Sequence, residues 1–247
     1  MLLRDRVVLV TGGARMGASL GAALGACGAR VAFSYARSAE AIAQAAADTA
    51  AAGGQSHILQ ADLRDPDACG RLVDDVVAWG GGIDVLVALA STYDRVPLDD
   101  VTPDTWRSHL AVDLDATFHC ARAAARHMRA QGSGGHLIFC SDWVAASARP
   151  RYTGYVPYYV AKAGVVALTE ALALELAGDG IQVNAIAPGP ILPAAGSTAE
   201  MQAAVLQATP LGRWGGPDVV THAVMGLLQQ DWVTGQTVRV DGGRHLV

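Results

Sequence analysis

A tyrosine and a lysine four residues apart are the pair in this sequence best suited to transfer a proton. Tyr158 and Lys162 follow Pro157, which favours the first turn of a helix because its missing N–H needs no partner there. At this spacing the two side chains share one helix face, whereas Tyr155 precedes the helix and Tyr159 projects from another side. A phenol, with a pKa of about 10, is a weak acid–base group until a cation favours its anion. We therefore predict that Tyr158 transfers the proton and that Lys162 activates it and binds ribose hydroxyls of a cofactor.

A glycine-rich turn near the N-terminus is suited to binding a dinucleotide. An apolar run of strand length leads into Thr11-Gly12-Gly13-Ala14-Arg15-Met16-Gly17, and a helical stretch follows. The glycines let the backbone approach a pyrophosphate closely, and the helix N-terminus supplies free N–H groups and a favourable dipole. A plain turn between a strand and a helix is the alternative, and its position on the first strand favours the dinucleotide.

The residues after the second predicted strand indicate which cofactor is bound. An NAD site places an acidic residue there to bind the ribose 2′-hydroxyl, and Tyr35 and its neighbours offer none. Arg15 and Arg37 are instead available to bind a 2′-phosphate, which favours NADP(H), although they are equally explained as two solvated arginines. Asp62 follows the third predicted strand, and it either accepts from the adenine amino group or caps the next helix.

The elements that position these residues alternate between strand and helix. Apolar runs predict strands at residues 7–10, 31–33, 56–59, 85–88, 136–140 and 181–187. Alanine-rich stretches between them predict helices at 18–26, 39–52, 66–79, 105–130 and 158–177. Strands that are apolar throughout suit a sheet buried on both faces, and the alternation predicts a parallel, doubly wound sheet. We expect one α/β domain over residues 1–247, with a loop at 191–197 over its cleft.

Composition limits the classes of function that remain. The chain has 247 residues and a net charge of -5, without the basic character that nucleic-acid binding requires. Its four cysteines and seven histidines show no zinc-ligand spacing, so no metal site is expected. No apolar run is long enough to span a membrane and no secretory signal precedes the first strand. We therefore expect a cytoplasmic protein that acts on a small molecule.

Several further motifs occur in the order in which one family carries them. They are the glycine turn, Asp62-Leu63, residues 84–87, Tyr158-x-x-x-Lys162-Ala163, and residues 183–189, 210–213, 234–236 and 240–243. With them the chain resembles the short-chain dehydrogenase/reductase family over essentially its whole length. The resemblance implies a Rossmann-type sheet with helices on both faces and a homo-oligomer, either a dimer or a tetramer. It also implies cofactor contacts from Gly12, Met16, Gly17, Tyr35, Asp62, Leu63, Ala90, Tyr158, Lys162, Pro188, Gly189 and Ile191.

Two departures from the family pattern concern polar residues near the pair. Asp113 stands at the position of the family's catalytic asparagine, so we expect its carboxylate near Lys162. Residues 88–91 read Ala-Leu-Ala-Ser in place of the usual Asn-Asn-Ala-Gly. The glycine turn is also one residue shorter than usual, which places Met16 beneath the nicotinamide.

A further departure lies at the position of the catalytic serine. Aligned by the strand that ends at Cys140, Asp142 falls at that position, and a shift of one residue places Ser141 there instead. Both remain candidates. An aspartate there, together with Ala90 and Tyr35, is similar to the pteridine-reductase-like branch, in which an aspartate and a tyrosine protonate a pterin ring nitrogen.

The leading hypothesis is an NADPH-dependent reductase of a C=O or C=N bond, in a pterin-like or ketone substrate, with Tyr158 as proton donor. One alternative is an oxidoreductase of 3-oxoacyl thioesters or of alcohols and ketones in the same family. Another is a non-catalytic nucleotide-binding protein, which Asp113 and the altered residues 88–91 suggest. The aromatic residues Trp143, Tyr152, Tyr155 and Trp214 are candidates for lining a substrate pocket.

Overall fold

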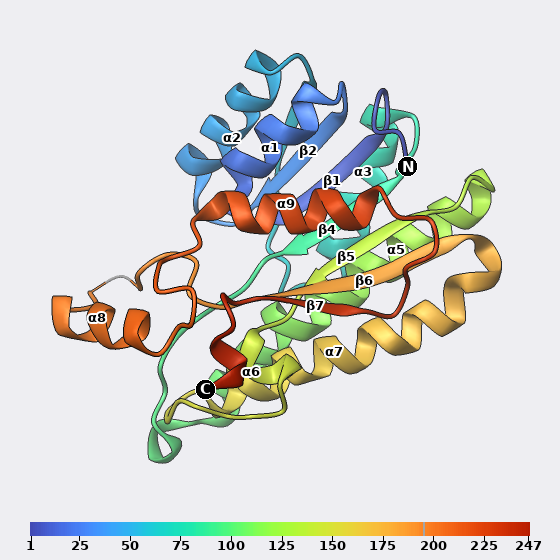
Figure 1. Ribbon diagram of the computed structural model, residues 1–247. Helices are drawn as coiled ribbons and strands as arrows, with labels where there is room; N and C mark the ends of the chain where they lie inside the picture. The colour runs from blue at the N-terminus through green and yellow to red at the C-terminus, as the bar shows by residue number, and fades with distance from the viewer. Residues whose placement is uncertain (195) are drawn as a thin grey trace.

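A seven-stranded parallel sheet forms the centre of the computed structural model, which describes residues 1–194 and 196–247 (Figure 1). The strand order is β3-β2-β1-β4-β5-β6-β7. The strands are β1 (Val7–Gly12), β2 (Arg30–Tyr35), β3 (Gln55–Gln60), β4 (Val85–Leu89), β5 (Gly135–Cys140), β6 (Ile181–Pro188) and β7 (Thr237–Val240). Every neighbouring pair is parallel, which confirms the predicted doubly wound, Rossmann-type sheet.

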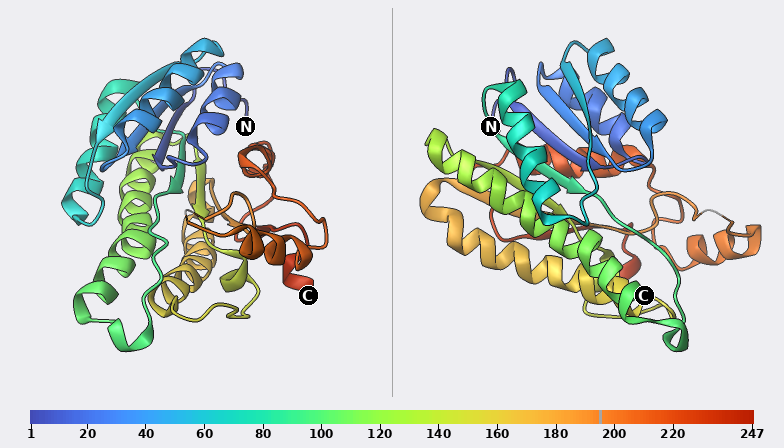
Figure 2. Two further views of the ribbon diagram at one scale, coloured as in Figure 1. Left: turned by 90° about the vertical axis from the view of Figure 1, so that its left-hand side faces the viewer. Right: turned by 180° about the vertical axis from the view of Figure 1, so that it is seen from behind.

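Helices cover both faces of the sheet (Figures 1 and 2). One face carries α1 (Gly17–Ala26), α2 (Ala39–Ala51) and α9 (Pro217–Leu228), and the other carries α3 (Pro66–Gly80), α5 (Ala116–Gln131) and α7 (Val156–Leu176). Shorter helices are α4 (Pro103–Leu110), α6 (Trp143–Ala146) and α8 (Ala199–Gln207), with single 3₁₀ turns η1 (Leu98–Asp100), η3 (Ala177–Asp179) and η4 (Arg244–Leu246). Among the described residues, no helix is long and apolar enough to cross a membrane.

Strands β1 and β4 are mainly apolar because both of their faces are buried. In β1, Val7 and Leu9 pack into the core beneath α3 and α5, whereas Val8 and Val10 pack into the core beneath α1 and α9. All four side chains are at most 3% exposed. Successive side chains of a strand point to opposite faces, so an unbroken apolar run fills two cores at once.

The carboxyl ends of the central strands bring the candidate residues to one edge of the sheet. Strand order reverses between β1 and β4, and ligands of such sheets bind outside the strand ends at this reversal. The glycine turn follows β1 and Ala90 follows β4, while Asp142 follows β5 and Gly189 follows β6. The fold therefore gathers segments that lie far apart in the sequence.

Some elements differ from those expected. The seventh strand, β7, was not among the predicted strands because its four residues alternate between apolar and polar at the sheet edge. Helices α8 and α9 were also not predicted, and α9 begins only after Gly216, whose φ of 77° ends the preceding loop. The helix expected at 105–130 is divided into α4 and α5 by a π-helical turn, η2 (Ala111–Asp115). The predicted loop at 191–197 includes residue 195, which lies outside the described residues.

Candidate active site

Helix α7 places the tyrosine and the lysine side by side in the interior. It begins at Val156 with Pro157 in its first turn, so Tyr158 and Lys162 lie one turn apart on its buried side. Tyr158 is 7% exposed and Lys162 is 1% exposed. Lys162 is also the only lysine among the 247 residues. A buried ammonium is costly unless it is paired, so its partners define the site.

Two oxygen atoms hold the Lys162 ammonium. Its Nζ donates to the main-chain oxygen of Cys140 at 2.9 Å and lies 3.3 Å from Oδ1 of Asp113. The same atom lies 5.7 Å from the centre of the Tyr158 ring. An ammonium has three N–H donors, so one remains for a further acceptor.

Asp113 is fully buried, and four groups besides Lys162 surround it. The π-helical turn at Ala111–Asp115 presents its carboxylate towards the end of β4. Both the Ser91 and the Thr92 hydroxyls donate to it, the latter at 2.7 Å, and the Thr92 N–H donates at 3.2 Å. His109 Nδ1 lies 3.7 Å from the carboxylate. The structure thus places Asp113 as the counterion of the buried lysine.

Asp142 is the residue that meets the tyrosine hydroxyl. Its Oδ1 accepts from the N–H of Val144 and so caps α6, and its Oδ2 accepts from the Tyr158 hydroxyl at 2.9 Å. Burial raises the pKa of the Asp142 carboxyl, against the opposing effect of these two hydrogen bonds. A carboxyl whose pKa is raised can hold a proton and release it to a neighbour.

Ser141 makes a different contact. Its hydroxyl donates to the main-chain oxygen of Lys162 at 2.9 Å, and its side chain is buried against α7. Of the two candidates for the serine position, the structure brings Asp142 and not Ser141 to the Tyr158 hydroxyl.

The protonation of Tyr158 differs from what the lysine alone suggests. Burial, and next the nearby negative charge of Asp142, raise the pKa of the Tyr158 phenol well above its usual value. The phenol is therefore protonated at neutral pH in this structure, whereas the sequence had suggested a lysine-stabilised phenolate. Burial and the negative charge of Asp142, to which the hydroxyl donates, both favour the protonated phenol.

The glycine turn has the features that a dinucleotide requires. Gly12 and Gly13 have φ values of 66° and 86°, which only glycine adopts readily. A Cβ on Gly12 would lie 2.6 Å from the Cα of Ala90, so the turn packs closely against the end of β4. Helix α1 begins at Gly17. No side chain caps it, and its first turn contains no acidic residue. The Gly17 N–H donates to the Gly13 carbonyl, and the next two N–H groups, of Ala18 and Ser19, are free for an anion.

The residues expected around the adenosine are arranged only partly as the sequence suggested. Arg37 is exposed after β2, next to the half-buried Tyr35. Arg15, expected at the 2′-phosphate, instead donates to the main-chain oxygens of Leu192 and Pro193, at 3.2 and 3.1 Å, on the loop over the cleft.

Asp62, a candidate adenine acceptor, is bound by its neighbour Arg64. The hydrogen bond from the Arg64 guanidinium lowers the pKa of Asp62 to about 2. Asp62 does not cap the next helix, because the side chain at the start of α3 that accepts from the backbone is Asp65. Leu63 beside it is buried.

The loop after β6 closes the opposite side of the cofactor cleft. A Cβ on Gly189 would lie 2.6 Å from Cβ of Asp241, so the close approach of the segment after β7 requires a glycine after Pro188. Ile191 is 8% exposed and packs in the core beneath α1 and α9, which Met16 also contacts. No group of three or more histidine, cysteine or acidic side chains able to hold a metal occurs among the described residues.

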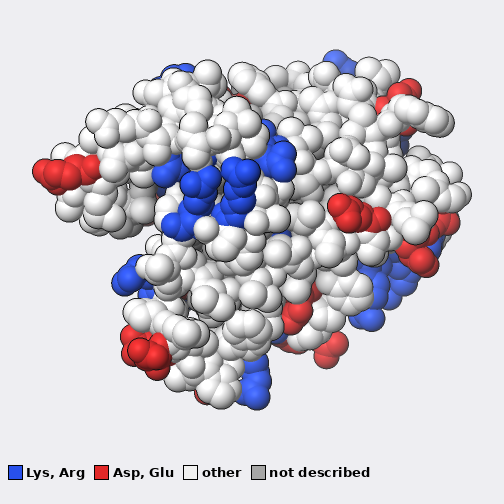
Figure 3. Space-filling model, turned by 60° about the horizontal axis from the view of Figure 1, so that its bottom comes forward, with Lys and Arg blue, Asp and Glu red and all other residues white. Residues whose placement is uncertain are grey.

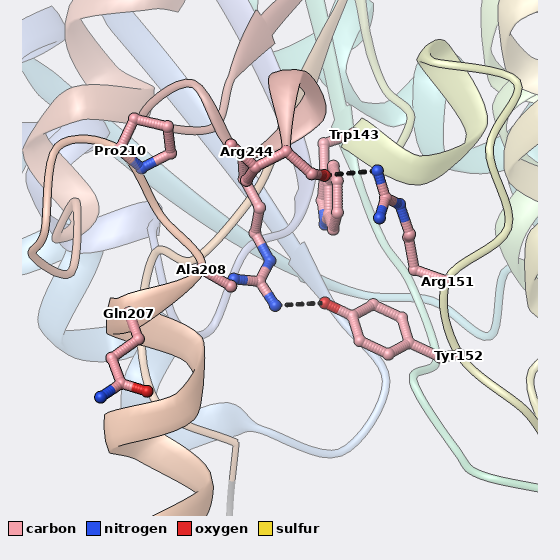
Figure 4. Close-up of a pocket in the computed structure, with 8 residues that line it drawn as sticks. Trp143, Arg151, Tyr152, Gln207, Ala208, Pro210 and Arg244 are labelled. Atoms are coloured by element: carbon pink, nitrogen blue, oxygen red, sulfur yellow. Dashed lines mark hydrogen bonds between the residues drawn. The ribbon is translucent and has the colours of Figure 1, made fainter.

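Aromatic rings continue from Tyr158 to a neighbouring pocket. Tyr93 stacks on Tyr155, with ring centres 4.9 Å apart, and its ring lies edge-on to Tyr158 at 5.0 Å. Tyr155 is followed by Tyr152 at 6.2 Å, and Tyr152 by Trp143 at 6.3 Å. Trp143 and Tyr152 line a pocket of about 380 Å³ (Figure 4). Of the four aromatic candidates, Trp143 and Tyr152 line this pocket, and Tyr155 and Trp214 are not among its lining residues.

Sequence reasoning did not single out the residues that hold Asp113. Ser91 was interpreted only as part of the altered residues 88–91, and Thr92 was not considered, although both follow β4 at the edge where the site forms. His109 lies four residues before Asp113, a spacing that places two side chains on one helix face. That the chain has a single lysine was a further signal in the sequence, since it singles out Lys162 and hence the acid that pairs with it.

Comparisons with known proteins agree with this geometry. The chain matches the family described as Enoyl-(Acyl carrier protein) reductase over residues 13–245. It is 34% identical to cis-4-hydroxycyclohexanecarboxylate dehydrogenase of Sinomonas cyclohexanicum, over 97% of this chain and 96% of that protein. It is also 34% identical to 3-oxoacyl-(acyl-carrier-protein) reductase of Synechocystis sp., over 98% and 97% respectively.

Solved structures show the same relationship. A short-chain dehydrogenase/reductase from Serratia marcescens superposes with a TM-score of 0.91 at 30% identity, covering 99% of this chain and all of that one. These relatives indicate the same family as three features of the chain itself: its motifs, its parallel sheet and its buried Tyr158–Lys162 pair. The chain therefore belongs to the short-chain dehydrogenase/reductase family of oxidoreductases, which act on small molecules with a nicotinamide cofactor.

Proposed function

We propose that this protein is an NADPH-dependent reductase of a C=O or C=N bond in which Tyr158 donates the proton and Asp142 supports it. The observation that carries the proposal is the 2.9 Å hydrogen bond from the Tyr158 hydroxyl to a buried carboxyl whose pKa is raised. Both groups hold protons more tightly than usual. Tyr158 therefore carries its proton at neutral pH and has it available for substrate.

The residues present fit a nicotinamide dinucleotide phosphate. The uncapped start of α1 and the open glycine turn would hold the pyrophosphate, and Arg37 would face the 2′-phosphate, since β2 ends without an acidic residue. Pro188, Gly189 and Ile191 would border the nicotinamide. When bound, NADPH supplies the hydride, and the protein contributes binding, orientation and the proton.

Each polar residue then has a separate task. Tyr158 donates its proton to the oxygen or nitrogen of the substrate, and Asp142 both orients the phenol and replaces its proton. Lys162 places a positive charge beside the tyrosine ring and keeps one N–H for a ribose hydroxyl, while Asp113 balances that charge. Arg15 holds the loop at Leu192 and Pro193 over the cleft.

The relatives indicate the range of substrates to examine first. Their names identify a dehydrogenase of a hydroxycyclohexanecarboxylate and a reductase of 3-oxoacyl groups, and these point to a ketone carbonyl in our protein. The Asp142–Tyr158 pair adds ring C=N bonds such as those of dihydropterins, because two linked acids can protonate a nitrogen.

Replacement of Tyr158 tests the proposal. In Tyr158→Phe, we expect the rate of NADPH oxidation with an active ketone or dihydropterin to fall about 10²- to 10⁴-fold, because the proton donor is lost while the ring remains. The matched control is Tyr159→Phe, which removes a hydroxyl from the next residue of α7 and should keep the rate. Substituting NADH for NADPH measures the cofactor preference. A Tyr158→Phe enzyme with the wild-type rate contradicts the proposal, and so does a wild-type protein that binds NADPH but turns over none of these substrates.

A further inference from the structure

Four arginines gather around the last residues of the chain on one face of the molecule. Arg149 precedes α7, Arg239 lies on β7, and Arg151 and Arg244 line the pocket that contains Trp143. Figure 3 shows basic side chains forming a continuous group on this side, apart from the acidic side chains in view. Since Lys162 is the only lysine and is buried, this group is formed by arginines. A protein of net charge -5 thus concentrates positive charge at one place.

Three of these guanidinium groups, those of Arg149, Arg239 and Arg244, bind only neutral partners; Arg239, for example, donates to the Ala146 carbonyl and the Ser147 hydroxyl. Arg151 instead donates to an oxygen of Val247, the last residue of the sequence, where a chain terminus carries a carboxylate. No aspartate or glutamate of the described residues forms an ion pair with any of the four. In contrast, six arginines elsewhere in the chain each pair with an aspartate: Arg6, Arg64, Arg71, Arg107, Arg126 and Arg129.

The acidic residue nearest to Arg244 in the sequence already has hydrogen-bond partners of its own. Asp241 is buried, and it accepts from the Nδ1 of His245 at 2.7 Å and from two main-chain N–H groups. It therefore does not neutralise the neighbouring Arg244. The positive charge of Arg244 therefore remains available to a ligand in the pocket, although Val247, which binds Arg151, also lines it.

Arg244 is held in a fixed position within this pocket (Figure 4). Its guanidinium carbon lies 5.4 Å from the centre of the Trp143 ring, and it donates to the Val205 carbonyl at 2.8 Å and the Tyr152 hydroxyl at 3.3 Å. Its Nε is buried without a hydrogen-bond partner. A guanidinium stacked on a ring and fixed at both ends loses little freedom when it binds an anion.

The pocket lies next to the reacting groups. Trp143 directly follows Asp142 in the chain, and Tyr152 contacts Tyr155, whose ring centre is 6.4 Å from that of Tyr158. The cofactor residues lie on the other side of the site, at the ends of β1 and β2. An anion in this pocket therefore belongs to the substrate and not to the dinucleotide.

We propose that the pocket lined by Arg151 and Arg244 binds an anionic group of the substrate, remote from the bond that is reduced. The inference rests on the proposed function and adds the substrate class: a ketone or imine that carries a carboxylate or phosphate. Charge-assisted hydrogen bonds from Arg244, and from the N–H groups of Arg151 that Val247 does not use, hold the anion. The rings of Tyr152 and Tyr155 border the connecting part of the substrate.

Paired substrates test the role of Arg244. For the carboxylate source, 4-oxocyclohexanecarboxylate is compared with its methyl ester, and for the phosphate source, acetoacetyl-coenzyme A is compared with ethyl acetoacetate. In Arg244→Gln and Arg151→Gln, we expect the ratio of kcat/KM for the anionic over the neutral substrate to fall about ten- to hundredfold in one pair, through a rise in KM. Arg244→Lys should recover part of this loss. The pair that responds identifies the source of the anion.

The control is Arg71→Gln. It removes an exposed arginine of α3 whose guanidinium pairs with Asp65, the residue before that helix. It should leave both ratios unchanged. Ratios that stay unchanged in both pairs for Arg244→Gln and Arg151→Gln overturn the inference.

A binding measurement separates this inference from the proposed function. Calorimetric titration with cyclohexanecarboxylate and with inorganic phosphate, neither of which can be reduced, needs no turnover. Binding of one probe to the wild type that weakens at least tenfold in Arg244→Gln but not in Arg71→Gln supports the pocket even if no substrate is reduced. Equal binding by all three proteins, or no binding of either probe to the wild type, overturns it.

Discussion

Asp113 and Asp142 both contact the Tyr158–Lys162 pair, and they do so in very different surroundings. Asp113 lies at a π-helical turn inside the fold, where it receives hydrogen bonds from Ser91 and Thr92 and faces the lysine ammonium. Asp142 lies at the end of β5, where its oxygens accept from one main-chain N–H and from the tyrosine hydroxyl. Burial raises the pKa of Asp142, and only these two hydrogen bonds and the lysine charge oppose that rise.

The difference teaches that a carboxylate's donors determine its task. A buried aspartate surrounded by N–H and O–H donors and a cation serves as a fixed negative charge. A buried aspartate with few donors holds a proton readily and can exchange it with the group that it touches. The comparison therefore assigns structural support to Asp113 and proton exchange to Asp142, and four tests can break or sharpen it.

Removal of Asp113 should have the largest effect, and the effect should be on stability. Asp113→Ala leaves the Lys162 ammonium buried with one main-chain acceptor, and breaking a buried ion pair in this way costs about 3–5 kcal/mol. We expect the free energy of unfolding in urea to fall by this amount. Asp142→Ala is the matched comparison and should cost about 1 kcal/mol, as for the loss of a helix cap. Equal losses in the two variants would remove the distinction between the carboxylates.

Removal of Asp142 should instead affect the chemistry. In Asp142→Ala the protein stays folded, and we expect kcat for reduction to fall about 10²-fold because Tyr158 loses both its orientation and its proton source. Steady-state kinetics at saturating NADPH measure this fall. The variant Asp142→Ser tests whether a hydroxyl can take over the function of the carboxyl. If Asp142→Ala keeps activity near the wild-type value, Asp142 serves only to cap α6.

Much of this arrangement could be predicted because it depends on local patterns. Apolar runs that fill two cores identify six of the seven strands, and the helix spacing of Tyr158 and Lys162 places them side by side wherever the helix lies. The glycine turn after β1 follows from the same reasoning, since a strand followed by glycines and a helix has few other conformations.

The rest could not be predicted because it depends on contacts between distant segments. The bonds from Ser91 and Thr92 to Asp113 join β4 to a π-helical turn that no periodicity reveals. The contact of Arg15 with the loop at Leu192 spans 177 positions in the sequence. The raised pKa of Tyr158 depends on how much of the fold covers it, whereas a tyrosine and a lysine on one helix suggest only the influence of the cation.

The pH dependence of Asp142 offers the finest test of the comparison. Because burial raises the pKa of its carboxyl, Asp142 keeps its proton over a higher pH range than an ordinary aspartate with a pKa of about 3.9. Below the raised pKa, the protonated carboxyl can restore the proton that Tyr158 gives to substrate. As the pH rises through that value, kcat for reduction should fall, by up to about tenfold per pH unit. In Asp142→Asn the side chain no longer titrates, so this part of the profile should be absent.

The pH dependence of stability provides a second measurement of the Asp142 carboxyl, and its direction follows from the raised pKa. A folded-state pKa above the unfolded value means that the folded protein binds the proton more tightly, so stability is highest below the unfolded pKa and decreases as the pH rises through the raised pKa. Asp142→Asn should remove that decrease from urea unfolding measured across pH, whereas the variant Asp113→Asn should leave it in place. If instead Asp113→Asn removes the dependence and Asp142→Asn preserves it, the proton belongs to the carboxylate beside the lysine, and the assignments of the two aspartates must be exchanged.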